Sequence, residues 1–233
     1  RWINALQKKS KLPLIVGMDA EWGASMRYDS IKKFPWNMTL GAIQNDELIE
    51  EIGYKIGSQL KTLGININFS PVVDINTNPL NPIIGNRSFG EDKMKVYQKS
   101  LKMMKGMHRA GILTCAKHFP GHGETVKDSH YDLPLVKFDK NRIDSVELYP
   151  YKKLIPQGIS AIMVGHLNYP ALDDGIPSSL SKKVVDSLLI KELDFKGLVI
   201  TDALEMKGVS EFKKYKNISL SAFLAGNDIL LIP

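Results

Sequence analysis

Short, almost continuously apolar runs recur along the chain, each followed by a polar or glycine-rich stretch and then by a helical pattern. Strands covered on both faces, as in parallel sheets, show such continuous apolarity rather than strict alternation. The pattern therefore predicts six strands, at residues 12–19, 65–74, 112–118, 159–166, 198–202 and 228–232.

The stretches between these runs have the period of amphipathic helices. In residues 45–63 an apolar residue returns every four positions, acidic residues occupy the first turn, and Gly64 follows the last turn. These are the usual signals for the start and the end of a helix. Residues 91–110 and 179–193 are predicted to be helices on similar grounds.

Alternating strands and helices at this spacing indicate an α/β fold, either a doubly wound sheet or a (β/α)8 TIM-type barrel. A doubly wound sheet often carries a glycine-rich phosphate loop, and no GxGxxG or GxxxxGK[ST] motif occurs here. In a barrel, the carboxyl ends of all strands line one shared site. The barrel is favoured because distinctive polar residues stand at several such ends: Asp19, Asp74, Lys117, His118, His166 and Asp202.

Composition and charge exclude several classes of protein. With 43% hydrophobic and 24% charged residues, the chain has an ordinary globular composition, and its single cysteine, Cys115, rules out an intramolecular disulfide framework. The net charge of +6 comes from scattered lysines without an aromatic-interleaved basic stripe, which argues against nucleic-acid binding. No apolar run approaches the ~20 residues of a membrane-spanning helix.

Three of the five histidines fall between residues 118 and 130, just after a predicted strand. A metal site is one interpretation, because His118 and His122 are four residues apart, as in helical HExxH sites. Pro120 and the glycines around it forbid that helix, however, and no glutamate follows His118.

A proton-transfer site is the second interpretation. Asp128 lies two residues before His130, close enough for the carboxylate to orient the imidazole and raise its pKa, so that it could protonate a leaving group. Asp202 ends the apolar run 197–201 and should project rigidly from its strand, as a nucleophilic carboxylate would. The plainer roles are a loop turn for Asp128 and His130 and a helix cap for Asp202.

Further polar residues suit a carbohydrate ligand, because sugar hydroxyls bind acidic acceptors and basic donors. Asp19 with Arg27, and Arg87, lie on loops after two other strands, although structural ion pairing is about equally consistent with their spacing. Asp74 and His166 are expected either behind the site or in the core, as hydrogen-bonding groups. Trp22 and Trp36 could stack on a ligand or simply cover apolar surface.

Several motifs resemble the β-N-acetylglucosaminidase (β-N-acetylhexosaminidase) branch of glycoside hydrolase family 3. They are KHFPGHG at residues 117–123 with DSH at 128–130, NRSFGED at 86–92 and ITDALEM at 200–206. The resemblance extends from residue 12 to residue 232. The KHFPGHG and DSH motifs are specific, because the β-glucosidase branch of the family lacks a loop with these histidines.

The resemblance implies a retaining exo-hydrolase with assigned residues. The aspartate matching Asp202 attacks the anomeric carbon, and the histidine matching His130, paired with Asp128, acts as general acid and then as base. This dyad replaces the second carboxylate, which retaining glycosidases usually place ~5 to 5.5 Å from the first. The residues that would bind the N-acetylglucosamine unit are Asp19, Arg27, Arg87, Lys117 and His118.

The match is imperfect at residues 19–23, where the family often has Asp-Gln-Glu-Gly-Gly and this chain has Asp-Ala-Glu-Trp-Gly. Asp19 is intact, but the shape of this side of the pocket is open. Trp22 could alter what lies beyond the N-acetylglucosamine.

The resemblance also implies a truncated barrel. Residues 12–19 match the third strand of the family, whereas a complete barrel has eight strands and ~250 residues. The 233-residue chain begins with Arg1 rather than Met and stops after an apolar run. We therefore expect one catalytic barrel domain, residues 1–233, incomplete at both ends and truncated to about strands 3–8.

The predicted function is removal of non-reducing terminal β-N-acetylglucosamine from peptidoglycan-derived fragments, with no cofactor and no metal. Three alternatives stay open: a metal-dependent barrel hydrolase using His118, His122, His130 and Asp202, a β-GlcNAc phosphorylase, and a sugar-binding module. Phosphorolysis stays open because a neutral histidine repels an anionic acceptor less than a carboxylate does.

The expected partner is a carbohydrate, either a GlcNAc-containing glycan or a muropeptide, with no nucleic acid and no membrane contact in this segment. The sequence leaves room for an appended domain. Bacterial cytoplasm and cell envelope both stay open, because a signal peptide would precede Arg1.

Overall fold

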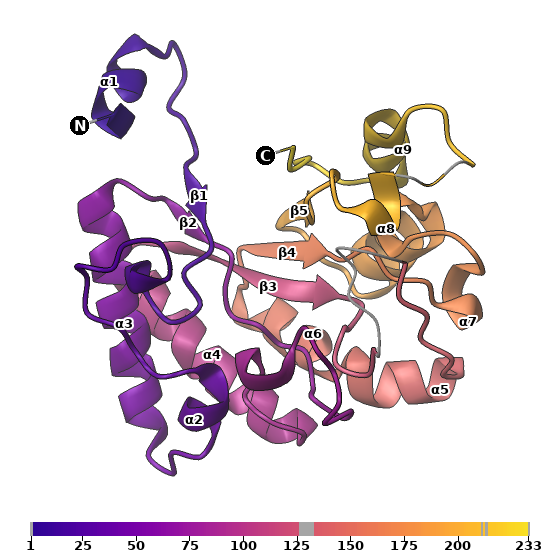
Figure 1. Cartoon of the computed structure of the whole chain (residues 1–233), viewed down its shortest axis with the longest axis horizontal. Helices are drawn as coiled ribbons and strands as arrows, with labels where there is room; N and C mark the ends of the chain where they lie inside the picture. Colours follow the sequence, from indigo (N-terminus) through magenta and orange to yellow (C-terminus); the bar gives the residue numbers. More distant parts are fainter. Residues whose placement is uncertain (1, 126–132, 211, 213, 233) are drawn as a thin grey trace.

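The computed structural model describes residues 2–125, 133–210, 212 and 214–232. Its centre is a parallel sheet of five strands in the order β1-β2-β3-β4-β5 (Figure 1). The strands are β1 (Gly17–Met18), β2 (Ile67–Asn68), β3 (Leu113–Phe119), β4 (Ala161–Val164) and β5 (Leu198–Thr201). Because each strand pairs in parallel with the next one along the chain, the predicted α/β class is confirmed.

Each connection between successive strands contains helical segments. The α-helices are α1 (Trp2–Lys9), α2 (Asn37–Gly41), α3 (Asp46–Leu63), α4 (Lys93–Arg109), α5 (Lys140–Arg142), α6 (Tyr149–Leu154), α7 (Pro170–Asp173), α8 (Lys207–Ser210) and α9 (Ile218–Ala225). Shorter 3-10 turns are η1 (Ala24–Met26), η2 (Gly85–Arg87), η4 (Ile155–Gln157) and η5 (Ser178–Leu180), and π-helical segments are η3 (Ile143–Glu147) and η6 (Lys183–Glu192). None of the helices in the described part of the chain combines the length and apolarity of a membrane span.

The two long helices form as the sequence predicts. Asn45 caps α3 by accepting a hydrogen bond from the Glu47 N–H, and Gly64 ends it in the left-handed conformation at φ 85°. Asp92 caps α4 in the same way, through the Lys95 N–H. The two helices pack closely because Gly106 has no side chain: a Cβ there would lie 2.0 Å from the carbonyl oxygen of Glu50.

The sheet is apolar on both faces, which explains its nearly continuous apolar strands. Cys115 belongs to a small buried cluster on one face, with Ile67, Ala161, Met163 and Ile200. The neighbouring Ala116 belongs to the large core under the helices, because successive residues of a strand point to opposite faces.

Two predicted strands are much shorter than expected. Of residues 12–19 only Gly17 and Met18 pair, and of residues 65–74 only Ile67 and Asn68 form strand β2. Pro13 and Pro71 lack the N–H group that a sheet ladder needs. Hydrogen bonding to β3 nevertheless continues irregularly past β2, where Val73 N–H donates to the Lys117 carbonyl oxygen.

The prediction of a sixth strand at residues 228–232 is wrong. Ile229 makes one isolated parallel bridge with Ile200. Side chains interrupt the ladder on both sides: Asp228 Oδ2 accepts the Val199 N–H at 2.8 Å, and Thr201 Oγ1 accepts the Leu231 N–H at 3.0 Å. The five parallel strands are consistent with the predicted (β/α)8 TIM-type barrel truncated to about strands 3–8, and the barrel itself stays a prediction.

The predicted helix 179–193 is irregular rather than α-helical. It divides into η5 and the π-helical η6. Ser181, in an extended backbone conformation, separates the two segments and caps the second one, because its Oγ accepts the Val184 N–H at 3.2 Å. At its end the Leu193 N–H donates to the carbonyl oxygen of Leu188, five residues back.

Candidate active site

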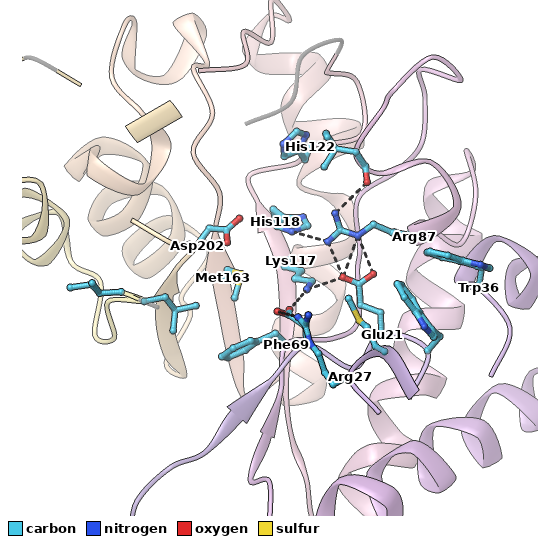
Figure 2. Close-up of a pocket in the computed structure, with 17 residues that line it drawn as sticks. Glu21, Arg27, Trp36, Phe69, Arg87, Lys117, His118, His122, Met163 and Asp202 are labelled. Carbon is cyan, nitrogen blue, oxygen red and sulfur yellow. Dashed lines mark hydrogen bonds and ion pairs between the residues drawn. The ribbon is translucent and has the colours of Figure 1, made fainter. Parts of the chain in front are cut away.

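A pocket of about 570 Å³ opens at the carboxyl ends of the strands, a size typical of small-molecule sites. Figure 2 shows charged side chains at its centre, with Asp202 and Trp36 on opposite sides. It is lined by Asp19, Glu21, Trp22, Met26, Arg27, Trp36, Phe69, Ile83, Arg87, Lys117, His118, His122, Met163, Asp202, Ala203, Leu231 and Ile232. The structure thus brings six predicted residues together: Asp19, Arg27, Arg87, Lys117, His118 and Asp202.

Lys117, near the end of β3, is the central cation of the pocket and is only 2% exposed. Its Nζ lies 2.8 Å from Asp19 Oδ1 and 2.9 Å from Glu21 Oε1. The other oxygen of Asp19 pairs with Arg27 at 3.0 Å. Burial lowers the pKa of Lys117, but the carboxylates of Glu21 and Asp19 raise it by more. The net direction is upward, so the ammonium stays charged.

Neighbouring residues of a strand normally point to opposite faces, yet Lys117 and His118 both line the pocket. The pairing register of β3 with β4 shifts between Lys117 and Phe119. Such a bulge re-aims side chains. The irregular end of β3 therefore delivers two adjacent functional groups to one site.

Arg87, from η2, occupies the middle of the pocket. Its Nε and Nη2 bind the two oxygens of Glu21 at 3.0 and 2.8 Å, and its Nη1 donates to the Ile83 carbonyl oxygen at 3.2 Å. Nη2 also lies 3.4 Å from Nε2 of His118. Both arginine and lysine are thus held in place before any ligand enters.

Glu21 was missed as a site residue in the sequence. It is 1% exposed and accepts from both Arg87 and Lys117. Burial alone would raise the pKa of Glu21, but the two cations lower it to about 2. The available signal was its place two residues after Asp19, since alternate residues of an extended segment share a face.

Asp74 holds residues 118–123, the histidine loop, in place through hydrogen bonds. Its carboxylate accepts the His118 Nδ1 hydrogen at 2.7 Å, the His118 N–H at 3.2 Å and the His122 N–H at 2.7 Å. Burial raises and His118 lowers the pKa of Asp74, with a net downward direction. Asp74 is therefore a buried hydrogen-bonding group behind the site, one of the two roles expected for it.

The glycines of the histidine loop are required for two reasons, close contact with neighbouring backbone at Gly123 and a positive φ at Gly121. A Cβ at Gly123 would lie 1.7 Å from the carbonyl oxygen of Ile75, and Gly121 has φ 148°. The carbonyl oxygen of Gly121 accepts the Tyr169 hydroxyl at 2.5 Å. The loop between His118 and Gly123 is thus seated directly on the segment that carries Asp74.

Asp202 follows β5, and its N–H donates to the Val164 carbonyl oxygen at 2.9 Å. The only hydrogen bond of its carboxylate within the described residues comes from the Ala203 N–H, at 2.8 Å. Burial raises the pKa of Asp202, but His118, His166 and Lys117 lower it, and the net direction is downward. The carboxylate is therefore ionised and lines the pocket.

His166 lies fully buried behind Asp202. Its ring contacts Ser179 Oγ at 2.7 Å and the Ala203 carbonyl oxygen at 2.9 Å. It thereby ties the residue after Asp202 to η5. This is again one of the roles expected from the sequence.

Asp128 and His130, the predicted acid-base dyad, lie outside the described residues. His130 also belongs to the predicted metal alternative. Among the residues that the structure does describe, no group of three histidine, cysteine, aspartate or glutamate side chains could hold a metal ion. His118 Nδ1 and His122 Nδ1 are occupied by Asp74 and Thr125, at 2.7 Å each.

Fold and site define an α/β half-barrel with a charged pocket at the carboxyl ends of its parallel strands. The chain belongs to glycoside hydrolase family 3, because the model of the "Glycosyl hydrolase family 3 N terminal domain" matches residues 2–233. The predicted family is therefore confirmed.

Individual relatives support this membership. Beta-hexosaminidase A of Pseudoalteromonas piscicida is 39% identical over 98% of this chain and 41% of its own length. A family 3 β-N-acetylglucosaminidase from Paenibacillus sp. str. FPU-7 superposes with a TM-score of 0.94 at 39% identity, covering 99% of this chain and 44% of its own. The β-glucoside phosphorylase BglX superposes with a TM-score of 0.95 at 27% identity, covering 100% and 44%. The chain thus spans less than half the length of each of these relatives.

Proposed function

We propose that this chain carries the catalytic pocket of a retaining, exo-acting β-N-acetylglucosaminidase that removes non-reducing terminal β-N-acetylglucosamine. The observation that carries the proposal is the position of Asp202, an ionised carboxylate facing a preformed cradle of Lys117, Arg87 and His118. Relatives named β-hexosaminidase and β-N-acetylglucosaminidase support the same substrate.

Each part of the pocket has a task in this reaction. Asp19, Arg27, Arg87, Lys117 and His118 bind the hydroxyl groups of the terminal sugar and orient its anomeric carbon toward Asp202. The paired charges need little rearrangement when the substrate enters, so the pocket is electrostatically preorganised. Binding energy is then available for the transition state rather than for ordering side chains.

The reaction proceeds in two displacements. A carboxylate oxygen of Asp202 forms a bond to C1 while the bond from C1 to the leaving oxygen breaks, and His130, oriented by Asp128, gives its proton to that oxygen. Water then attacks C1 and gives a proton to His130, and the bond between Asp202 and C1 breaks. The two inversions retain the β configuration.

The replacement Asp202→Ala in the full-length gene product tests the proposal. Release of p-nitrophenol from its β-N-acetylglucosaminide should fall by on the order of 10⁴-fold, since a covalent step is lost. Asp174→Ala is the matched control, because Asp174 is exposed and should leave the rate unchanged. Near-normal activity of Asp202→Ala would sink the assignment.

The covalent intermediate supplies an independent measurement. A 5-fluoro glycosyl fluoride of N-acetylglucosamine slows the second displacement more than it prevents the first, so the glycosyl-enzyme accumulates. Mass spectrometry of the digested protein should locate the sugar on the peptide that contains Asp202. Sugar found on a different carboxylate would contradict the role of Asp202.

Peptidoglycan-derived fragments are the proposed natural source of the β-N-acetylglucosamine ends. A GlcNAc–MurNAc disaccharide should then be cleaved with a higher kcat/KM than N,N′-diacetylchitobiose. The reverse order would contradict this source while leaving the proposed reaction intact.

Phosphorolysis is the second candidate function, and the structural similarity to the β-glucoside phosphorylase BglX favours it. In that reaction phosphate replaces water in the second displacement. The two are separated by their product: phosphate buffer would yield N-acetylglucosamine 1-phosphate, whereas hydrolysis yields the free sugar in every buffer.

A further inference from the structure

The pocket has two unlike ends. Asp202 stands at one end, and Trp36 stands across the charged centre formed by Lys117 and Arg87 (Figure 2). Trp22 also lines the pocket, and its ring lies against that of Trp36, with centroids 4.0 Å apart and planes inclined at 43°. We call Trp22 and Trp36 the tryptophan wall.

The tryptophan wall is tied to the same groups that hold the charged centre. Next to Trp36, the side chain of Asn37 donates to the carbonyl oxygen of Arg87 at 2.7 Å. The carbonyl oxygen of Trp22 accepts the Phe34 N–H at 3.2 Å. The residue after Trp36 is thereby tied to the backbone of Arg87, and the backbone of Trp22 is tied to that of Phe34.

The turn after Trp22 requires glycine and is anchored by a hydrogen bond. Gly23 has φ 94°, and a Cβ there would lie 2.9 Å from Gln59 Oε1 and 3.0 Å from Phe34 Cδ2. Gln59 Oε1 also accepts the Ala24 N–H at 3.1 Å. The loop is thus fastened to α3 immediately after Trp22.

Ring geometry decides which part of a sugar meets the tryptophan wall. In a pyranose, C4 lies across the ring from C1. With C1 at Asp202, the leaving oxygen on C1 and the N-acetyl group on C2 both lie at the Asp202 end. C4, and the C6 group attached beside it, therefore point toward the opposite end, where Trp36 stands.

We propose that Trp22 and Trp36 close the pocket beyond C4 of the bound sugar and thereby restrict it to chain ends that carry no substituent on O4. This inference rests on the proposed function and names the residues that enforce its exo action. Indole rings suit the task, because their apolar faces pack on sugar C–H groups while their N–H groups can donate to a hydroxyl. Among the described residues, neither indole N–H has a hydrogen-bond partner.

The ratio of kcat/KM for two substrates tests the role of the tryptophan wall. The full-length gene product is assayed on p-nitrophenyl β-N-acetylglucosaminide and on its 4-O-methyl derivative, which adds one small group at the point of closure. The wild type should strongly prefer the parent compound. Trp22→Ala and Trp36→Ala should each raise the relative kcat/KM for the 4-O-methyl compound by about 10-fold or more, since one carbon in a closed pocket commonly changes selectivity by that amount.

Three comparisons make the result decisive. Trp2→Ala is the matched control, since Trp2 is 85% exposed on α1 and outside the pocket, and its ratio should equal that of the wild type. A variant that only loosens the fold slows both substrates equally and leaves the ratio unchanged. If an alanine variant does not fold, Trp22→Phe and Trp36→Phe should change the ratio in the same direction by less.

Three outcomes overturn the inference in different ways. An unchanged ratio in folded Trp22→Ala and Trp36→Ala, with normal wild-type activity, refutes the wall and leaves the proposed function standing. A changed preference between the p-nitrophenyl glycoside and diacetylchitobiose, with the 4-O-methyl ratio unchanged, would place the tryptophans at the leaving group instead. A wild type that does not turn over the parent compound refutes the proposed function and the wall with it.

Discussion

The guanidinium group of Arg87 holds the carboxylate of Glu21 through two nitrogens, with Nε 3.0 Å from Oε2 and Nη2 2.8 Å from Oε1. The same carboxylate binds Lys117 Nζ at 2.9 Å. Such forked pairs fix the plane of both groups. Glu21 therefore sets the spacing between the two cations that are proposed to bind the sugar.

The first prediction concerns Glu21→Gln, which keeps the shape of the side chain and removes its charge. Arg87 and Lys117 then lose a shared counter-charge in a buried place, at a cost of about 3–5 kcal/mol in unfolding free energy. Because both cations would shift, KM for the p-nitrophenyl substrate should rise by more than kcat falls. Chemical denaturation and steady-state kinetics measure the two effects.

Glu51→Gln is the control for that experiment. Glu51 pairs with Lys55 and Arg109 on the surface of α3. Exposed ion pairs contribute little, so neither stability nor KM should change measurably. Equal behaviour of the two variants would show that the charge of Glu21 does not organise the pocket.

The second prediction follows from the pKa of Glu21, which is about 2 in the folded protein against 4.5 for an unperturbed glutamate. A carboxyl group whose folded pKa is the lower one stabilises the folded state above its unfolded pKa and loses that contribution as the pH falls. The stability difference between wild type and Glu21→Gln should therefore be constant near neutral pH. It should shrink between about pH 4.5 and 2, by about 1.4 kcal/mol per pH unit at most. A difference that grows on acidification would contradict the ion pair.

The third prediction concerns Asp74→Asn. The carboxylate accepts from three N–H groups of His118 and His122, whereas an amide offers one acceptor oxygen and adds two donors. At least one buried donor then loses its partner, at a cost of about 1–3 kcal/mol. The melting temperature and kcat/KM should both fall. Asp174→Asn, on the surface, should change neither.

The sequence predicted those structural features whose signals lie in neighbouring residues, and it missed those that depend on residues far apart in the chain. The caps at Asn45 and Gly64 and the strand ends at Lys117 and Asp202 were predictable, because helix caps and apolar runs are read from neighbouring residues. The partners of Glu21 were not, since Arg87 lies 66 residues away and nothing in the local pattern marks the pair. Likewise, residues 228–232 form an apolar run that predicts a strand, yet the side chain of Asp228 accepts the Val199 N–H that would otherwise pair with strand backbone.

The fourth prediction concerns Gly123→Ala in the histidine loop. The added Cβ would lie 1.7 Å from the Ile75 carbonyl oxygen, so the loop must move away from the segment that carries Asp74. The Ile75 backbone cannot move aside as a flexible side chain does, so the histidine loop and its site residues are displaced. A small displacement of positioned groups usually costs about 10²-fold in rate, and kcat/KM should fall by that amount. Gly158→Ala is the comparison, because a Cβ there meets nothing within 4 Å and only the backbone conformation at φ 84° is strained. It should lose some stability and keep its activity.

The last prediction separates the proposed acid from the proposed nucleophile. His130 would protonate the leaving oxygen, and a substrate with an acidic leaving group needs little protonation. His130→Ala should therefore cleave p-nitrophenyl or 2,4-dinitrophenyl β-N-acetylglucosaminide far better than diacetylchitobiose, relative to wild type, whereas Asp202→Ala should lose all three. The dependence of log kcat/KM on the pKa of the leaving group should accordingly be steeper in His130→Ala than in the wild type. Equal losses on good and poor leaving groups would mean that His130 supports the structure and that the leaving-group proton comes from elsewhere.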